Sequence, residues 1–196
     1  MRRPFLTTAV LMVTLGLVAG CATSPQSSFY TLTPVPPAEQ ADTAAPKTIT
    51  IGAVMVPEIV DRPQLVLRVN ANEVNFDEFA RWADSLKAQV RRVIAADLAL
   101  QFPSALVSGY PGTVDPTSSY QVSIDVESFE SAVGDTSAVS VLWSVRPPKG
   151  AVVNGRTVVR VPTGGPGYDA LIAAHSKALA AVSGDIATAI RSTLRS

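Results

Sequence analysis

The feature that most constrains the fold of this chain is an uncharged apolar run, Phe5–Val18, directly behind Arg2 and Arg3. A positive start, a short apolar stretch and small residues before a cleavage site are the three parts of an export signal. The run is shorter than the roughly 20 residues that a helix needs to cross the hydrocarbon core, which argues against a transmembrane helix. We therefore expect residues 1–20 to be removed, so that only the chain behind them folds.

The next feature is a lone cysteine at the end of this signal. Residues Val18–Cys21 resemble the lipobox of bacterial lipoproteins, whose cysteine sulfur receives a diacylglycerol before cleavage. Cys21 is the single cysteine, so it can form no internal disulfide, and acylation would leave no free thiol. We expect a diacylglycerol and an N-acyl chain on Cys21 and no other cofactor. Ala22 stands where lipoproteins of the inner membrane often carry Asp, which by resemblance favours the periplasmic face of the outer membrane.

Charge and composition narrow the classes of partner. Removal of Arg2 and Arg3 leaves 14 of the 16 basic residues against 16 acidic ones, a net charge of −2. Arg91-Arg92 is then the only adjacent basic pair, and nucleic acids or anionic lipid surfaces require more clustered positive charge. We expect no nucleic-acid partner. A charged fraction of 16% beside 47% apolar residues indicates a globular protein and not a disordered stalk.

The expected organisation is a signal peptide (1–20), a lipidated tether (21–27) and a single periplasmic domain (28–196). Residues 33–46 are rich in Pro and Ala, a composition typical of extended, poorly packed segments. Because Phe29–Thr33 just before them has the composition of a short strand, the Pro-rich segment is either a tether or a long loop behind a first strand.

Alternating apolar residues predict the strands. The first run, Thr48–Pro57, is expected to bury every second side chain, namely Ile49, Ile51, Ala53 and Met55. A second strand, Gln64–Asn70, precedes a turn and a short strand around Val74 and Phe76. Residues 120–129 and 139–145 predict a hairpin that turns near Gly134-Asp135. Asn154-Gly155 predicts the turn of another hairpin, since this pair accepts positive φ angles.

Two helices complete the predicted fold. Apolar residues recur at helical spacing from Phe79 to Leu98, with Asp77 and Glu78 placed favourably for the N-terminal macrodipole and Pro103 behind the end. Residues 168–194 predict a terminal helix with one apolar stripe. The fold class is therefore α+β, with a mixed, mainly antiparallel sheet and two long helices packed against it.

The sequence offers few groups for catalysis. His175 is the only histidine and falls on the apolar stripe of the terminal helix, so we interpret it as a partly buried helix residue. Ser108 and Ser183 each precede a glycine, but no Gly-x-Ser-x-Gly elbow occurs. One histidine and an acylated cysteine provide too few ligands for a metal site. We expect no catalytic residue and no metal ligand.

The carboxylates and the glycine-rich loop also give no sign of a catalytic or phosphate-binding site. Asp125 and Glu127 share the solvent face of a predicted strand, with Glu130 beyond, which indicates a solvated surface and not an acid–base pair. The loop 164–167 contains a proline and lacks the Lys-Ser/Thr of a phosphate-binding loop.

Several segments, in order behind the lipobox, resemble the ABC-type transport auxiliary lipoproteins, the PqiC-like family. They are Phe29–Leu32, Ile51–Glu58, Asp61–Gln64, Arg81–Leu86, Trp143 and the helix around Ala178–Ala187. Asp84 stands where the family often carries Glu, and the resemblance favours a loop over a tether for residues 33–46. The resemblance implies eight motif residues with a structural or partner-contacting role: Tyr30, Pro57, Asp61, Arg62, Pro63, Gln64, Arg81 and Trp82.

The resemblance also implies a function. Members of this family accompany an ABC transporter and a periplasmic MCE-domain protein (PqiB-like) in systems that move lipid between membranes and support membrane integrity. The expected role is therefore non-enzymatic docking of the periplasmic component at the outer membrane, with homo-oligomerisation as an open possibility. Two alternatives stay open from the residues alone: a lipid-binding carrier lipoprotein and a periplasmic hydrolase.

Physical reading of the motifs adds two expectations. Pro63 restricts Arg62 to extended geometry, and Asp61 is well placed for an ion pair with Arg62 that fixes the turn. Arg81 beside Trp82 is expected either to cap the first long helix or to stack on an aromatic ring.

Overall fold

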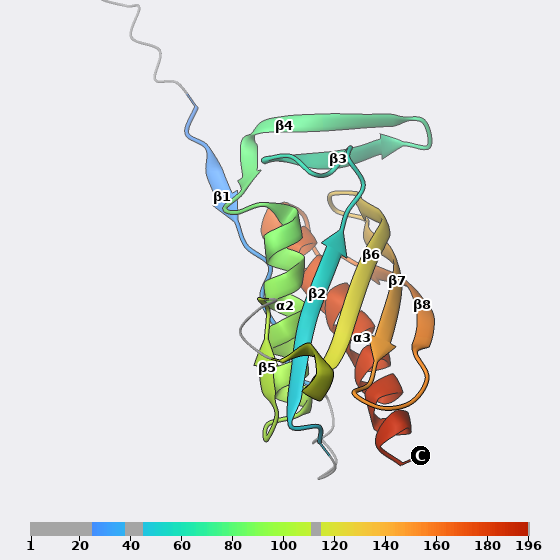
Figure 1. The fold of residues 1–196 in the computed structure, drawn as a ribbon. Coiled ribbons are helices and arrows are strands. Elements are labelled where there is room, and N and C mark those ends of the chain that lie inside the picture. Colours follow the sequence, from blue (N-terminus) through green and yellow to red (C-terminus); the bar gives the residue numbers. More distant parts are fainter. Residues whose placement is uncertain (1–24, 38–44, 111–114, 196) are drawn as a thin grey trace, which may run out of the picture.

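The computed structural model describes residues 25–37, 45–110 and 115–195. Cys21, the signal peptide and much of the Pro-rich segment lie outside the described residues. The described chain forms two mixed sheets and two long helices, so the expected α+β class is confirmed (Figure 1). The strands divide between two sheets, where the sequence pattern suggests one.

The larger sheet has the strand order β5-β2-β6-β7-β8. Its strands are β2 (Thr48–Met55), β5 (Leu106–Ser108), β6 (Tyr120–Ser131), β7 (Thr136–Arg146) and β8 (Val153–Pro162). Strand β2 pairs in parallel with both β5 and β6, whereas β6–β7 and β7–β8 are antiparallel. A 3₁₀ turn, η1 (Pro116–Ser118), leads into β6. The predicted hairpin of β6 and β7 is confirmed, and Gly134 takes a positive φ of 73° in its turn.

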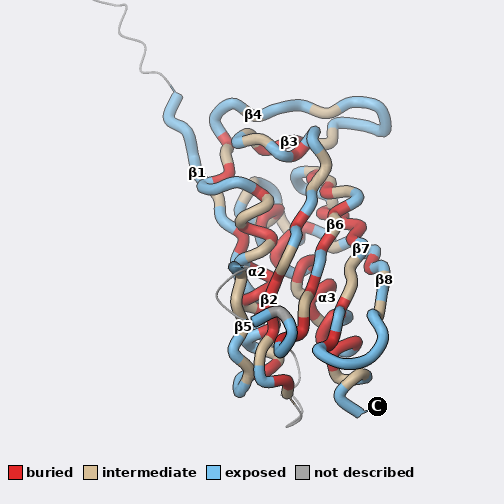
Figure 2. Tube along the Cα trace, in the orientation of Figure 1, coloured by how far each residue is buried: buried red, intermediate tan, exposed pale blue. Residues whose placement is uncertain are grey.

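Both helices, α2 (Leu86–Gln101) and α3 (Tyr168–Leu194), lie on one face of this sheet (Figure 1). The predicted bounds and apolar stripe of α3 are confirmed. Its buried stripe residues are Leu171, Ala174, Leu179, Val182, Ile186 and Ile190. The inward positions of β6 match them, since Val122, Ile124 and Val126 are all buried. The core therefore lies between the helices and the large sheet, as the burial colouring of Figure 2 shows.

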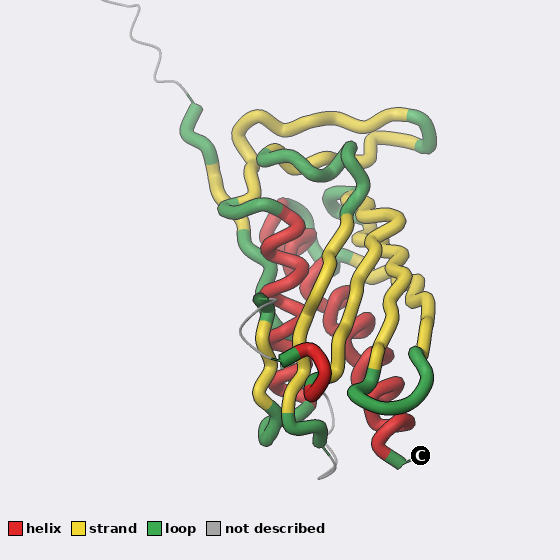
Figure 3. Tube along the Cα trace, in the orientation of Figure 1, coloured by secondary structure: helices red, strands yellow, loops and turns green. Residues whose placement is uncertain are grey.

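A smaller sheet, with the order β1-β4-β3, crosses one end of the molecule (Figures 1 and 3). Strand β1 (Ser28–Tyr30) runs parallel to the end of β4 (Glu73–Trp82), and β3 (Gln64–Asn70) pairs antiparallel with β4. The turn predicted at residues 70–72 joins β3 to β4.

The predicted start of the first helix was wrong. Phe79 and Trp82 belong to β4, and α2 begins only behind Ser85, whose hydroxyl accepts the N–H of Ala88 at 3.2 Å. The N–H of Trp82 donates to the Pro63 carbonyl at 2.7 Å, which keeps this stretch in the sheet. The helical spacing of Phe79 and Trp82 relative to Leu86 was coincidental, because long-range strand pairing overrides a local pattern.

The burial expected along β2 is also only half right. Ile49 and Ile51 are fully buried, but Ala53 and Met55 are exposed and Val54 is buried in their place. The pairing register of β2 with β6 shifts between Ile51 and Val54, which marks a bulge. One extra residue in a strand exchanges the two faces for everything that follows, because the side-chain period is two.

The hairpin predicted at Asn154-Gly155 was wrong as well. Both residues lie inside β8, and Gly155 pairs with Trp143 of the neighbouring strand β7. A Cβ atom on Gly155 would stand 2.1 Å from the Trp143 ring, so this glycine serves close packing and not a turn. A glycine within a strand often marks such a close approach.

Candidate functional site

The eight motif residues come from three distant segments, and the small sheet brings them together. Tyr30 pairs with Trp82 across β1 and β4, and Gln64 pairs with Arg81 across β3 and β4. The N–H of Ala83 donates to the Tyr30 carbonyl at 2.9 Å, which extends this junction toward α2. Strand pairing therefore gathers these residues where the small sheet meets the first helix.

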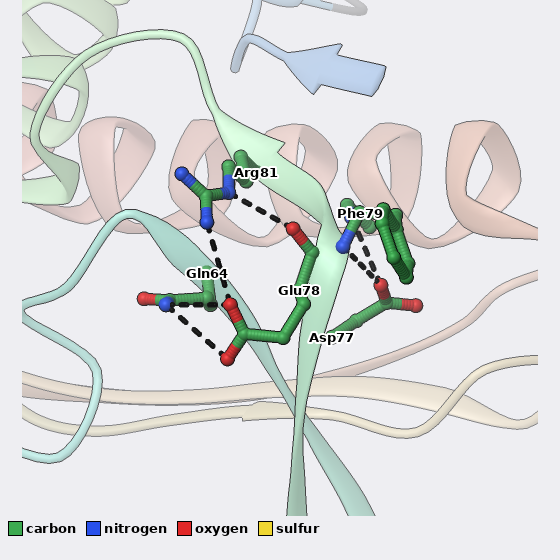
Figure 4. Close-up of polar contacts among 6 residues, drawn as sticks. Gln64, Asp77, Glu78, Phe79 and Arg81 are labelled. Atoms are coloured by element: carbon green, nitrogen blue, oxygen red, sulfur yellow. Dashed lines mark hydrogen bonds and ion pairs between the residues drawn. The ribbon is translucent and has the colours of Figure 1, made fainter. Parts of the chain in front are cut away.

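A carboxylate joins two of the motif side chains (Figure 4). Gln64 Nε2 donates to Glu78 Oε2 at 3.2 Å, and the Arg81 guanidinium lies 3.3 Å from the same oxygen. Arg81 Nε also donates to the Glu78 carbonyl at 2.9 Å. Arg81 thus neither caps α2 nor stacks on an aromatic ring, and both of those expectations were wrong. The cluster lies on the surface and holds no nucleophile, so its chemistry is limited to shaping and charging that surface.

The turn before β3 is built differently from the expected Asp61–Arg62 ion pair. The carbonyl of Pro57 accepts the N–H groups of Val60 and Asp61, at 3.0 and 3.1 Å. Asp61 pairs instead with Lys87 of α2 at 2.8 Å, and the Arg62 guanidinium lies over the Phe76 ring at 4.0 Å. The turn is therefore fixed by its backbone and by α2.

Aromatic contacts hold the small sheet to the rest of the domain. Trp82 is buried and meets Phe129 of β6 edge-on, with ring centroids 6.1 Å apart. Tyr30 packs against Tyr168 at the start of α3 at 5.6 Å. The Tyr168 hydroxyl donates to Asp77 Oδ2, and this hydrogen bond lowers the pKa of the Asp77 carboxyl. Of the two roles expected for these motif residues, Tyr30 and Trp82 therefore have the structural one.

The chain behind β1 is tied to the helices by buried polar side chains. Gln89 Oε1 accepts the N–H of Leu32 at 2.8 Å, and Asp97 Oδ1 accepts the N–H of Val35 at 2.9 Å. Burial raises the pKa of Asp97 to about 6. Sequence reasoning missed both residues, although a polar residue beside the apolar stripe of α2 is a visible signal. The described start of the Pro-rich segment is thus a loop held against the fold.

His175 is fully buried, whereas its place on the apolar stripe predicted only partial burial. Its ring stacks on Phe129 at 3.9 Å, and its two nitrogens lie 2.7 Å from the hydroxyls of Ser131 and Ser137. Burial lowers the pKa of His175 to about 3, so the ring is neutral at physiological pH. With no exposed surface, the imidazole cannot reach a substrate, and its role is to fill the core.

The serines and carboxylates considered from the sequence also have structural positions or partners. Ser183 is buried and donates to Asp97 Oδ2 at 3.1 Å, whereas Ser108 lies partly exposed in β5. Glu127 pairs with Arg156 at 2.7 Å, and Glu130 pairs with Arg68 at 3.2 Å. Within the described ranges no three His, Cys, Asp or Glu side chains gather as metal ligands. The described helices include none long and apolar enough to span a membrane.

The face of the large sheet away from the helices carries a shallow groove of about 350 Å³. The apolar residues that line it include Ala53, Met55, Leu142 and Trp143, and they lie beside Ser123 and Asp125. The β2 bulge creates this groove, because it turns Ala53 and Met55 outward. The sequence did not predict it, since the bulge is a product of pairing.

Comparison with known proteins agrees with this architecture. The family model of the ABC-type transport auxiliary lipoprotein component matches residues 30–187. A crystal structure described as an uncharacterized protein shares the fold with a TM-score of 0.70 and 19% identity, over 84% of this chain and 99% of that one. Protein XCC0632 from Xanthomonas campestris, assigned to family DUF330, gives a TM-score of 0.60 and 17% identity, over 82% of this chain and 93% of its own. A search of curated proteins finds no match.

Proposed function

Because this chain belongs to the ABC-type transport auxiliary lipoprotein components, we propose that it is a non-enzymatic docking subunit of an MCE-type lipid transporter. It would hold the periplasmic part of the transporter at the outer membrane. The observation that carries this proposal is the place of the motif residues in the structure. They build a surface junction of strands and ion pairs, and the one histidine is sealed in the core. Such a domain offers a partner a shaped and charged surface.

The membrane attachment is proposed to run through Cys21. Each buried methylene contributes about 0.8 kcal/mol to membrane binding, and a single acyl chain holds only marginally. A cysteine that carries two or three chains would therefore stay in the bilayer. Only residues 22–27 separate Cys21 from Ser28, the start of β1, so the tether is short.

Metabolic acyl labelling of the wild type and Cys21→Ser, with membrane fractionation, tests the anchor. We expect the wild type to carry the label and to sediment with the outer-membrane fraction, and the variant to do neither. An unlabelled wild-type protein that is free in the periplasm would overturn the proposal.

The docking role needs its own test. We expect crosslinking in cells to join the domain to an MCE-domain protein, and Glu78→Lys to weaken that crosslink by placing a second cation beside Arg81. Val158→Lys, on the distant edge strand β8, is the matched control. Recovery of only cell-wall components would contradict the role.

A second candidate function is a lipid carrier, and the outer groove is the observation in its favour. A volume of about 350 Å³ beside Met55 and Leu142 suits part of an acyl chain. Native mass spectrometry of the protein would show bound phospholipid if it acts as a carrier. Met55→Asp should then abolish the bound mass, whereas a docking subunit shows no lipid in either protein.

A further inference from the structure

The exposed phenylalanines of the described residues are all in the small sheet. Phe29 is 65% exposed, Phe79 is 48% exposed and Phe76 is 37% exposed, whereas Phe102 and Phe129 are buried in the core. A large apolar side chain left in water gains nothing for the fold, and a gathering of them at one end marks a contact surface.

Two of these residues lie on neighbouring strands of the small sheet, β1 and β4. Strand β1 pairs with the end of β4 so that Phe29 stands opposite Arg81, two residues beyond Phe79. Phe76 differs, because the Arg62 guanidinium already covers its ring. Phe29 and Phe79 are thus the pair available to something outside the domain.

The short distance along the chain to Cys21 indicates which surface the two rings meet. Pro25, the first described residue, is the fourth residue after Cys21, and β1 begins at Ser28. Even a fully extended chain spans at most about 3.6 Å per residue, so β1 stays within roughly 25 Å of the proposed anchor. The small sheet is therefore the part of the domain that the tether holds closest to the bilayer.

The basic side chains Arg81 and Lys87 at this end of the domain are already paired with carboxylates. Arg81 is paired with Glu78, and Asp61 is paired with Lys87. Charges that are already paired leave no strong attraction to anionic lipid, and the contact would depend on the aromatic rings. Phe, like Trp and Leu, lines the apolar faces of peripheral segments that enter the boundary between headgroups and acyl chains.

We propose that Phe29 and Phe79 insert into the headgroup boundary of the membrane that holds the anchor. This second attachment rests on the proposed lipidation of Cys21, and it orients the domain with its small sheet on the bilayer. The large sheet and its helices would then extend away from that membrane.

The test uses the full lipidated chain in vesicles of phosphatidylethanolamine and phosphatidylglycerol that contain nitroxide-labelled lipid. Since acylation consumes the only native thiol, a single introduced cysteine can carry a fluorophore. The labels are placed with Phe29→Cys, Phe79→Cys and Val158→Cys. Val158 is the matched control, because it is 64% exposed and lies on β8, the far edge of the large sheet. We expect quenching at least about threefold stronger at positions 29 and 79 than at 158.

A second measurement separates insertion of the rings from mere nearness. A fluorophore on Ser28→Cys should lose half or more of its quenching when Phe29 and Phe79 are both changed to Ser, and none when Val158 is changed to Ser. Equal quenching at positions 29, 79 and 158 in protein that floats with the vesicles would overturn the inference and leave the anchor intact. Protein that does not float would overturn both.

Discussion

The two sheets of this domain are stabilised in different ways. The large sheet buries one face under two helices, and two of the polar side chains sealed there, His175 and Asp97, have hydrogen-bond partners. The small sheet contributes fewer side chains to the core, among them Leu65, Ala80 and Trp82, and surface ion pairs and aromatic contacts also hold it. The first region therefore sets stability, whereas the second is free to carry the family motif and to meet partners.

The largest effect is expected at the tightest packing point of the large sheet. A methyl group on Gly155 would overlap three atoms of the Trp143 ring, at 2.1, 2.3 and 2.6 Å. The ring would have to move and would lose its hydrogen bond from Nε1 to Thr157 Oγ1, which is 2.9 Å long. Overpacking of a core costs up to about 3 kcal/mol and occasionally more, so we expect Gly155→Ala to lower the free energy of unfolding by about 3 kcal/mol in urea.

Two controls define this prediction. Gly184 in α3 has nothing within 4 Å of its Cβ position, so Gly184→Ala should stabilise the protein by up to about 1 kcal/mol. In a Trp143→Ala background, Gly155→Ala should cost less than about 1 kcal/mol, since the clash is gone. An equal cost in both backgrounds would mean that the ring is not the obstacle.

The next effect is the pH dependence of the free energy of unfolding, to which His175 and Asp97 make opposing contributions. The pKa of His175 is lowered by burial to about 3, from 6.5. Below pH 6.5 the unfolded chain therefore binds a proton that the folded chain refuses, and stability falls. Burial raises the pKa of Asp97 from 3.8 to about 6, so between those values the folded chain holds the extra proton, and stability rises as the pH falls. The two slopes oppose each other between about pH 6 and about pH 4.

Variants at either group should expose the other slope. In Asp97→Asn, the unfolding free energy should fall more steeply than in the wild type, by about 1.4 kcal/mol for each pH unit from about 6 to about 4. In His175→Gln, it should rise relative to the wild type over the same range. Urea titrations at several pH values measure both. Parallel curves for the wild type and both variants would contradict the opposing titrations.

The contrast between the sheets also explains what the sequence could predict. The stripe of α3 and the alternation of β6 are local patterns, and both were predicted correctly. The bulge in β2, the strand state of Phe79 and the contact of Gly155 with Trp143 depend on pairing between distant segments, which no local period records. The motif residues could be named in advance from the family resemblance, but their convergence arises only from the β1-β4-β3 pairing.

The smallest effect is expected in the small sheet, at the ion pair that its motif residues build. Glu78→Gln removes the charge that Arg81 meets at 3.3 Å, but an amide oxygen can still accept a hydrogen bond. Exposed ion pairs contribute about 0–1 kcal/mol, because water screens them and the side chains lose freedom in forming them. We expect a loss below about 0.5 kcal/mol in urea, with the melting curve almost unchanged. A loss near that of Gly155→Ala would show that the small sheet shares in the stability of the core. Its separate role as a contact surface would then have to be given up, since a surface with so large a part in folding could not vary freely for its partners.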